Sequence, residues 1–202
     1  MRLVLLLFFL SLFCSCETKD VEYAIVIHGG AGTILKKNMS DEMENAYIQK
    51  MEEAINAGYN ILEKNGSSID AVEATIKILE NSELFNAGKG SVLSNAGIVE
   101  MDASIMRGDN LNAGAISGVT TIKNPISAAR LVMEKSEHVF LSGKGAESFA
   151  KYENLQIIEN EYFITKRRLN SLRNAKKRDS LADNKYGTVG CVALDTDGNI
   201  TS

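Results

Sequence analysis

The sequence places one threonine where it could act as a nucleophile: Gly187-Thr188, directly before an apolar, strand-like run. A threonine hydroxyl is a weak nucleophile unless a base lies within hydrogen-bond reach. Cleavage of the chain before Thr188 would supply that base, since the released α-amino group has a reference pKa of about 8 and can accept the hydroxyl proton. Glycine at 187 suits the sharp backbone bend that such a cleavage needs. By itself, however, a Gly-Thr dipeptide is more often a plain strand entry.

Other catalytic and metal-binding motifs are incomplete in this sequence. His28-Gly29-Gly30 after a strand is similar to the oxyanion loop of lipases, but the Gly-x-Ser-x-Gly pentapeptide of those enzymes does not occur. Two Gly-Lys pairs, at 88–89 and 143–144, lack the spacing of a phosphate-binding loop. The sequence has only 2 histidines and no closely spaced cysteines in its body, which leaves no zinc ligand set. We therefore expect the base of any enzyme here not to be histidine.

Composition excludes several further classes. With 45% hydrophobic residues and a net charge of -4, the chain is of ordinary globular type and has no general affinity for nucleic acid. Aromatic residues make up only 6%, with no Trp, which disfavours a stacking platform for sugars or single strands. The basic run 166–178 lacks interleaved aromatic residues, so a solvated helix face or a connector explains it better than a nucleic-acid site.

The N-terminus is typical of an export signal. The apolar run 3–13 is too short to span about 30 Å of hydrocarbon but suits the core of a signal peptide. The following Cys14-Ser15-Cys16 resembles a loose lipoprotein box with Cys16 as the lipidated residue, although Phe13 replaces the usual aliphatic residue. A plain secretory signal cleaved nearby is the alternative. We expect residues 1–15 to be a signal peptide and the protein to be exported, either periplasmic or anchored in a membrane as a lipoprotein.

Hydrophobic periodicity predicts short strands alternating with helices. Ser40 or Asp41 opens the first helix and Asn65-Gly66 ends it; Ser67 or Ser68 caps a second helix, and Asn124-Pro125 opens a third. A buried strand is expected over 188–194, with Cys191 as an inert thiol. The other expected elements are strands near 23–27, 98–106, 113–122 and 139–141 and a short helix at 145–152. Together they favour layered sheets covered by helices over a doubly wound parallel sheet.

Seven segments occur in the same order as in the isoaspartyl peptidase/L-asparaginase family, the plant-type branch of the N-terminal-nucleophile hydrolases. The likeness covers about residues 22–202 and is specific only in combination. It resembles a complete α-subunit, residues 16–187, followed by the start of a β-subunit, residues 188–202. The segments are His28-Gly29-Gly30-Ala31-Gly32, Leu84-Phe85-Asn86-Ala87-Gly88-Lys89-Gly90, Met101-Asp102-Ala103-Ser104-Ile105-Met106, Ala113-Gly114-Ala115, Asn124-Pro125 with Ala129-Arg130-Leu131-Val132-Met133-Glu134, His138-Val139 and Gly187-Thr188-Val189-Gly190.

The resemblance implies an α+β fold, an αββα sandwich of N-terminal-nucleophile type that is incomplete at its C-terminus. It implies autocleavage at Gly187-Thr188 and hydrolysis of L-asparagine and β-aspartyl (isoaspartyl) dipeptides through an acyl-enzyme on Thr188. The loop of His28, Gly29 and Gly30 would lie near this nucleophile, and Asn86 near the oxyanion. A histidine that is merely satisfied in the core remains an equal interpretation of His28. The family also implies a homodimer of αβ units.

The family resemblance further implies a structural sodium ion and no other required cofactor. In many members backbone carbonyls of one loop hold this ion, and carbonyl ligands leave little trace in side-chain identity. The corresponding carbonyls here belong to Leu79, Glu80, Ser82, Phe85, Ala87 and Lys89.

Two alternatives remain at the level of sequence. Glycosylasparaginase shares the fold and the threonine, but it favours Asp-Thr-Ile-Gly where this chain has Gly187-Thr188-Val189-Gly190. Relatives also continue far beyond the point that corresponds to Ser202. That part holds their second active-site threonine, the Arg and Asp that bind the substrate's α-carboxylate and α-amine, and their Thr-Gly oxyanion donors. We therefore expect a fragment that is inactive as it stands, and a non-catalytic lipoprotein remnant is the second alternative.

Overall fold

The computed structural model describes residues 22–30, 39–177 and 188–202. The expected signal peptide at 1–15, the lipidation site Cys16 and the cleavage-site residue Gly187 lie outside the described residues. Within the described ranges, no helix combines the length and the apolar character needed to cross a bilayer.

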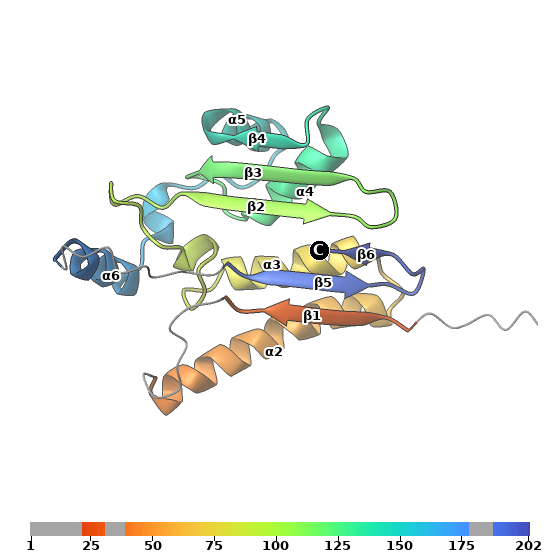
Figure 1. Cartoon of the computed structure of the whole chain (residues 1–202), viewed down its shortest axis with the longest axis horizontal. Coiled ribbons are helices and arrows are strands. Elements are labelled where there is room, and N and C mark those ends of the chain that lie inside the picture. The colour runs from red at the N-terminus through yellow and green to blue at the C-terminus, as the bar shows by residue number, and fades with distance from the viewer. Residues whose placement is uncertain (1–21, 31–38, 178–187) are drawn as a thin grey trace, which may run out of the picture.

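The strands form two small sheets that lie edge to edge (Figure 1). One has the order β1-β5-β6 and is antiparallel; the other has the order β2-β3-β4, in which β3 and β4 are parallel and are connected through α4. At one end β6 links the sheets, because Met106 and Ser202 exchange backbone hydrogen bonds of 2.8 and 3.1 Å. The strands are β1 (Ala24–His28), β2 (Met101–Met106), β3 (Ala113–Val119), β4 (Phe140–Ser142), β5 (Gly190–Leu194) and β6 (Ile200–Thr201).

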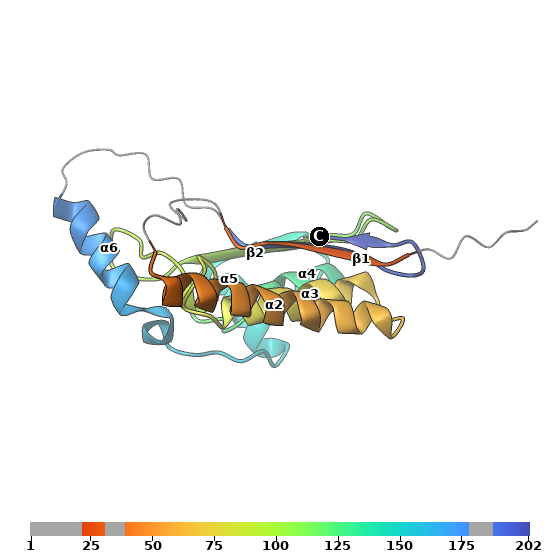
Figure 2. The ribbon, with the colours of Figure 1, turned by 90° about the horizontal axis from the view of Figure 1, so that it is seen from below.

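The helices cover one face of these sheets (Figure 2). Helices α2 and α3 bury Leu62 and Val72 beneath β1 and β5, whereas α4 and α5 bury Val132 and Ala146 beneath β2 and β3. On the opposite face Val26, Phe140 and Val192 are largely exposed. The helices are α2 (Asp41–Glu63), α3 (Ser68–Glu80), α4 (Pro125–Lys135), α5 (Gly143–Tyr152) and α6 (Lys166–Lys177), with short 3-10 turns η3 (Gly88–Gly90) and η4 (Asn160–Phe163).

The N-terminal ends of α2 and α3 lie where the capping residues in the sequence predicted them. The Ser40 hydroxyl accepts a hydrogen bond from Met43 N at 3.3 Å, and the Ser67 hydroxyl accepts one from Asp70 N at 3.3 Å, as expected for N-caps. Helix α2 ends at Glu63, and Asn65 just beyond it adopts a left-handed φ of 58°. The mixture of helices and sheets confirms the α+β class.

The buried strand expected over 188–194 is present as β5, but only one of its faces is buried. Strand β5 begins at Gly190, and its burial alternates: Cys191 and Ala193 face the helices, whereas Val192 is 46% exposed. The reason is that helices cover only one face of this sheet in the described part of the chain, so the two-residue period of a strand separates a buried side from an open one.

Asp195 fixes the β5–β6 hairpin to helix α3. Its carboxylate accepts hydrogen bonds from Ser68 N at 3.0 Å and Asn199 N at 2.8 Å, and Ser68 Oγ lies 2.9 Å from Thr201 Oγ1. Burial alone would raise the pKa of Asp195, but the hydrogen bonds from these two amides outweigh it and hold the pKa below its ordinary value. The strand that follows Thr188 is thereby held against α3.

We predict that Asp195→Asn destabilises the fold by about 1–3 kcal/mol at pH 7, because an amide offers one acceptor oxygen to two backbone donors. Because folding lowers the pKa of Asp195, the carboxylate contributes stability above its unfolded pKa of about 3.9, and this contribution is lost as the pH falls below that value. The difference in the free energy of unfolding between the wild type and Asp195→Asn, measured by urea unfolding, should therefore become smaller from pH 7 to pH 2.5. Asp197→Asn, at an exposed position of the same turn, is the control; an equal loss in both variants would contradict the prediction.

Candidate active site

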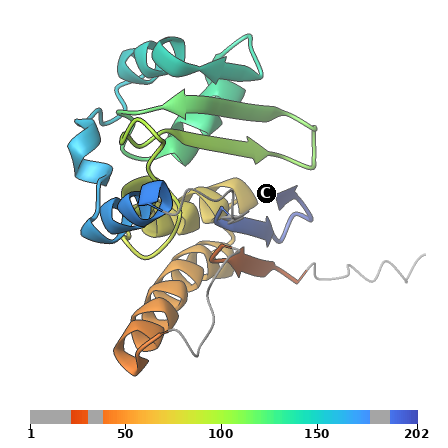
Figure 3. The ribbon, with the colours of Figure 1, turned by 60° about the vertical axis from the view of Figure 1, so that its left-hand side comes forward.

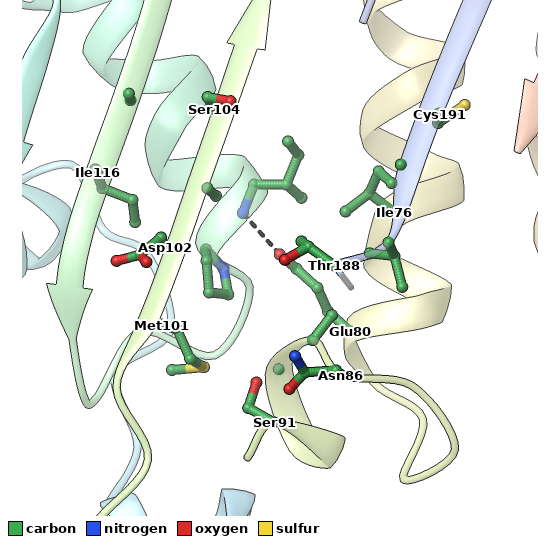
Figure 4. Close-up of a pocket in the computed structure, with 18 of the residues that line it drawn as sticks. Ile76, Glu80, Asn86, Ser91, Met101, Asp102, Ser104, Ile116, Thr188 and Cys191 are labelled. Carbon is green, nitrogen blue, oxygen red and sulfur yellow. Dashed lines mark hydrogen bonds between the residues drawn. The ribbon is translucent and has the colours of Figure 1, made fainter. Parts of the chain in front are cut away.

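A cavity of about 810 Å³ lies between the two sheets, above the C-terminal half of α3 (Figure 4). Strands β1 and β5 form one side of the cavity, strands β2 and β3 form the other, and the segment that follows α3 closes one end. Of the residues singled out from the sequence, those that line the cavity are His28, Glu80, Asn86, Ala87 and Thr188. The segments that carry them are far apart in the chain, so the fold brings together what the sequence could only place in order.

Thr188 and His28 are brought together by the pairing of β1 with β5, whose register sets His28 opposite Gly190. His28 Nδ1 lies 3.2 Å from the carbonyl oxygen of Thr188, and Gly30 N lies 3.3 Å from the same Nδ1. One ring nitrogen cannot donate to the carbonyl and accept from the amide at once, so the tautomer decides which bond forms. In either case Nδ1 contacts the backbone of the His-Gly-Gly loop or of Thr188 and leaves the Thr188 hydroxyl uncommitted.

Gly29 is closely surrounded by two side chains. A methyl group added to its Cα would come within 3.1 Å of Met51 Sδ and 3.2 Å of Phe85 Cε1. Phe85 belongs to the segment after α3 that also carries Asn86. The loop that follows β1 and the segment that follows α3 are therefore packed directly against each other, which ties the position of His28 to that of Asn86.

The side chain of Asn86 is oriented by a single hydrogen bond. Its Oδ1 accepts from Val92 N at 2.8 Å. With the amide oxygen committed to the backbone, the amide nitrogen lies on the other side of the group, toward Thr188 in Figure 4. A neutral N–H donor at such a position is a group that could stabilise a developing oxyanion.

The segment from Leu79 to Gly90 folds back on itself so closely that two positions admit only glycine. A methyl group on Gly88, whose φ is 50°, would collide with the Glu80 carbonyl, and one on Gly90 would collide with the Phe85 carbonyl. These approaches hold carbonyl groups inside the turn. Among the described residues no group of three or more His, Cys, Asp or Glu side chains could hold a metal.

Glu80 has a role that sequence reasoning missed. Its side chain is 3% exposed, and it accepts hydrogen bonds from Ile126 N at 2.9 Å (dashed in Figure 4) and from Asn124 Nδ2 at 3.0 Å. Burial is the largest influence and raises the pKa of Glu80 to about 8, although both hydrogen bonds oppose it. Asn124 precedes α4 as expected, but its side chain does not cap the helix. The Glu80 carboxyl group takes that place from another helix.

Asp102 and Ser104 add polar groups to the cavity wall. They occupy alternate positions of β2 and therefore share one face of the strand (Figure 4). Asp102 Oδ1 accepts a hydrogen bond from Gly118 N at 2.8 Å. The alternation of polar and apolar residues along β2 is the sequence signal for this pair, which we did not single out from the motif.

Comparison with known proteins gives one consistent result. A family model described as Asparaginase matches residues 21–202. The chain is 45% identical over 180 residues to a probable isoaspartyl peptidase/L-asparaginase 2 from Arabidopsis thaliana, an alignment that covers 88% of this chain and 55% of that protein. It is 40% identical over 188 residues to an isoaspartyl peptidase from Escherichia coli, covering 88% of this chain and 59% of that protein. A putative isoaspartyl peptidase/L-asparaginase from Dictyostelium discoideum is 40% identical over 215 residues, with coverages of 88% and 62%. The chain thus spans little more than half the length of these relatives.

We predict that Glu80→Ala destabilises the protein by about 2–4 kcal/mol, because it leaves a buried amide donor at Ile126 and a cavity beside it. Glu80→Gln should cost less, since its Oε1 can still accept from Ile126 N. Chemical unfolding at pH 6 measures both. Glu83→Gln, a neighbouring side chain that is more exposed, is the control. Equal stabilities for Glu80→Ala and Glu83→Gln would show that Glu80 does not hold α4.

Proposed function

The chain belongs to the asparaginase family, and on that premise we propose that it carries the nucleophile of an amide hydrolase acting on L-asparagine and β-aspartyl (isoaspartyl) dipeptides. The observation that carries the proposal is the position of Thr188, which lines the cavity together with Asn86 and whose backbone carbonyl lies beside His28. The names of the relatives favour this activity over the glycosylasparaginase and non-catalytic alternatives.

The proposed reaction begins with hydrolysis of the Gly187-Thr188 peptide bond, in which one water molecule is consumed, Gly187 gains a carboxyl group and the α-amino group of Thr188 is freed. That amine accepts the hydroxyl proton while Oγ attacks the carbonyl carbon of the substrate's side-chain amide. The Asn86 amide nitrogen donates a hydrogen bond to the oxyanion that forms. Collapse breaks the C–N bond, and the leaving amine takes the proton. Water then hydrolyses the ester on Thr188 and restores the free hydroxyl.

His28 would support this reaction through the backbone. In the tautomer with the proton on Nδ1, a hydrogen bond from Nδ1–H to the Thr188 carbonyl would hold Thr188 by its main chain and leave its hydroxyl free to rotate toward the substrate. Gly29 lets the loop after β1 pack closely against Met51 and Phe85, and Gly30 adopts a positive φ of 109°. His28 is thus a positioning residue and takes no proton from Thr188.

The described cavity lacks one group that the substrate requires. Neither lysine nor arginine occurs among the described residues that line it, although a substrate α-carboxylate needs a cationic partner. We propose that this partner lies in the part of the family fold that is present in the longer relatives but does not align with this chain. The exposed apolar face of β1, β4 and β5 would pack there against a second sheet and complete an αββα sandwich.

Three further proposals rest on the sequence and the family. The apolar run 3–13 and Cys16 support export, with periplasmic or lipid-anchored location as the two forms. The family resemblance supports a homodimer of αβ units. The close packing of Glu80 and Phe85 carbonyls against Gly88 and Gly90 supports a sodium site in the segment 79–90. Bound sodium would contribute a fixed positive centre that holds these carbonyls together, and no chemical step depends on it.

We predict that the natural gene product is cut before Thr188 and releases ammonia from asparagine. Thr188→Ala should leave the chain uncut and lower turnover by at least about 10³-fold, because nucleophile and base are lost together. Intact-mass spectrometry and an ammonia assay measure the two effects. Thr196→Ala, in the turn after β5, is the matched control. An uncut wild-type chain, or turnover that survives Thr188→Ala, would refute the proposal.

We also predict that replacing NaCl by choline chloride at equal ionic strength lowers the melting temperature by several degrees, because a cation that binds only the folded state stabilises it. Gly88→Ala should remove this dependence by filling the turn. Gly97→Ala is the matched control, since Gly97 also has a positive φ, 83°, but an added methyl group there meets nothing within 4 Å. Equal melting temperatures of the wild type in both salts would exclude the site.

A further inference from the structure

We infer that Arg167 and Arg168 of helix α6 are positioning residues for Asn86, and we call this pair the α6 clamp. The inference rests on the proposed function, in which the Asn86 amide nitrogen faces the oxyanion. The clamp binds the segment 83–90 on both sides of Asn86. Figures 1 and 3 show α6 beside this segment, which follows α3.

Arg167 binds the start of the segment. Its Nη2 donates to the carbonyls of Leu84 at 2.6 Å and Glu83 at 3.0 Å, and its Nη1 donates to Tyr47 Oη at 2.7 Å. Tyr47 in turn donates to the Leu84 carbonyl at 2.8 Å, and its ring packs edge-on against Phe85 with centroids 5.5 Å apart. One planar guanidinium therefore joins α6, α2 and the segment, a geometry that the single nitrogen of a lysine cannot reproduce.

Arg168 binds the end of the segment. Its Nε donates to the carbonyl of Gly90 at 2.6 Å, next to the Ser91-Val92 step whose amide at Val92 orients Asn86. An ion pair of 2.8 Å between Lys89 and Glu83 joins the two ends of the segment. The backbone on either side of Asn86 is thus tied to two consecutive arginines, so displacement of α6 would shift the anchor of the Asn86 side chain.

The clamp and the proposed sodium site use different carbonyls. Arg167 and Arg168 take those of Glu83, Leu84 and Gly90. The carbonyls assigned to sodium by the family resemblance belong to other residues of the same segment. Positive charge would therefore hold the segment from two sides, by a side chain on the outside and by an ion on the inside. Each cation satisfies acceptors that the other does not reach, which is a reason for both to be present.

The clamp is tested by replacing single arginines of α6 with neutral residues. Arg167→Gln and Arg168→Gln should raise the hydrogen-exchange rate of the Val92 amide by about tenfold or more, because that amide is protected by Asn86 Oδ1. In the asparagine assay kcat should fall by roughly 10- to 100-fold with KM changed less than about twofold, since the lost interaction acts in the transition state. Arg167→Lys should not restore kcat, and Tyr47→Phe should give a smaller change in the same direction. Arg173→Gln, an exposed arginine of the same helix, is the control.

Unchanged Val92 exchange in Arg167→Gln and Arg168→Gln, or an equal rise in Arg173→Gln, would overturn the clamp. Faster Val92 exchange with an unchanged kcat would show that the clamp holds the segment but does not position Asn86 for catalysis, and would overturn the inference as stated. A natural gene product that is neither cut before Thr188 nor active on asparagine would overturn the proposed function instead. The exchange measurement would still decide whether the clamp exists, so the two failures are distinguishable.

Discussion

The site depends on the antiparallel pairing of β1 with β5, strands from opposite ends of the chain. Their register sets His28 opposite Gly190 and so brings Thr188 to the edge of the cavity between the sheets. Asp195 reinforces the pairing from below by tying the β5–β6 hairpin to the first turn of α3. Because α3 also carries Glu80 at its far end, one helix fixes both the strand that follows Thr188 and the segment of Asn86. The placement of one hydroxyl therefore rests on a contact of long sequence range.

Glu80 shows how polar groups are shared at the end of α3. Its side chain accepts from the first turn of α4, while its backbone carbonyl packs against Gly88 in the turn that follows. The carboxyl group is buried, so every oxygen without a donor would carry a large desolvation cost, and the two hydrogen bonds from Ile126 and Asn124 offset that cost. The same residue thus joins the helix layer beneath one sheet to the helix layer beneath the other.

Sequence reasoning succeeded where the determining interaction is local. Ser40 and Ser67 cap helices within three residues of themselves, and their sequence signals were sufficient. It failed where the partner is distant: the Glu80–Asn124 bond spans 44 residues, and nothing in the local pattern distinguished it from an ordinary N-cap. The one-sided burial of β5 was missed for a related reason, because an apolar run does not reveal how many of its faces are covered. For Gly187 and Cys16, the sequence remains the basis of the prediction.

The basic helix α6 is the sharpest example of chemistry hidden from a sequence. Its charges predicted a solvated surface, and none of its residues is buried. Yet Arg167 and Arg168 bind main-chain carbonyls, partners that have no side-chain identity and so leave no pattern to recognise. A segment organised by carbonyl groups is instead recognisable by its glycines. Gly88 and Gly90 are required here because the chain passes close to the carbonyl oxygens of Glu80 and Phe85. In a segment organised by carbonyl groups, glycine spacing therefore says more about the site than the positions of its charged side chains.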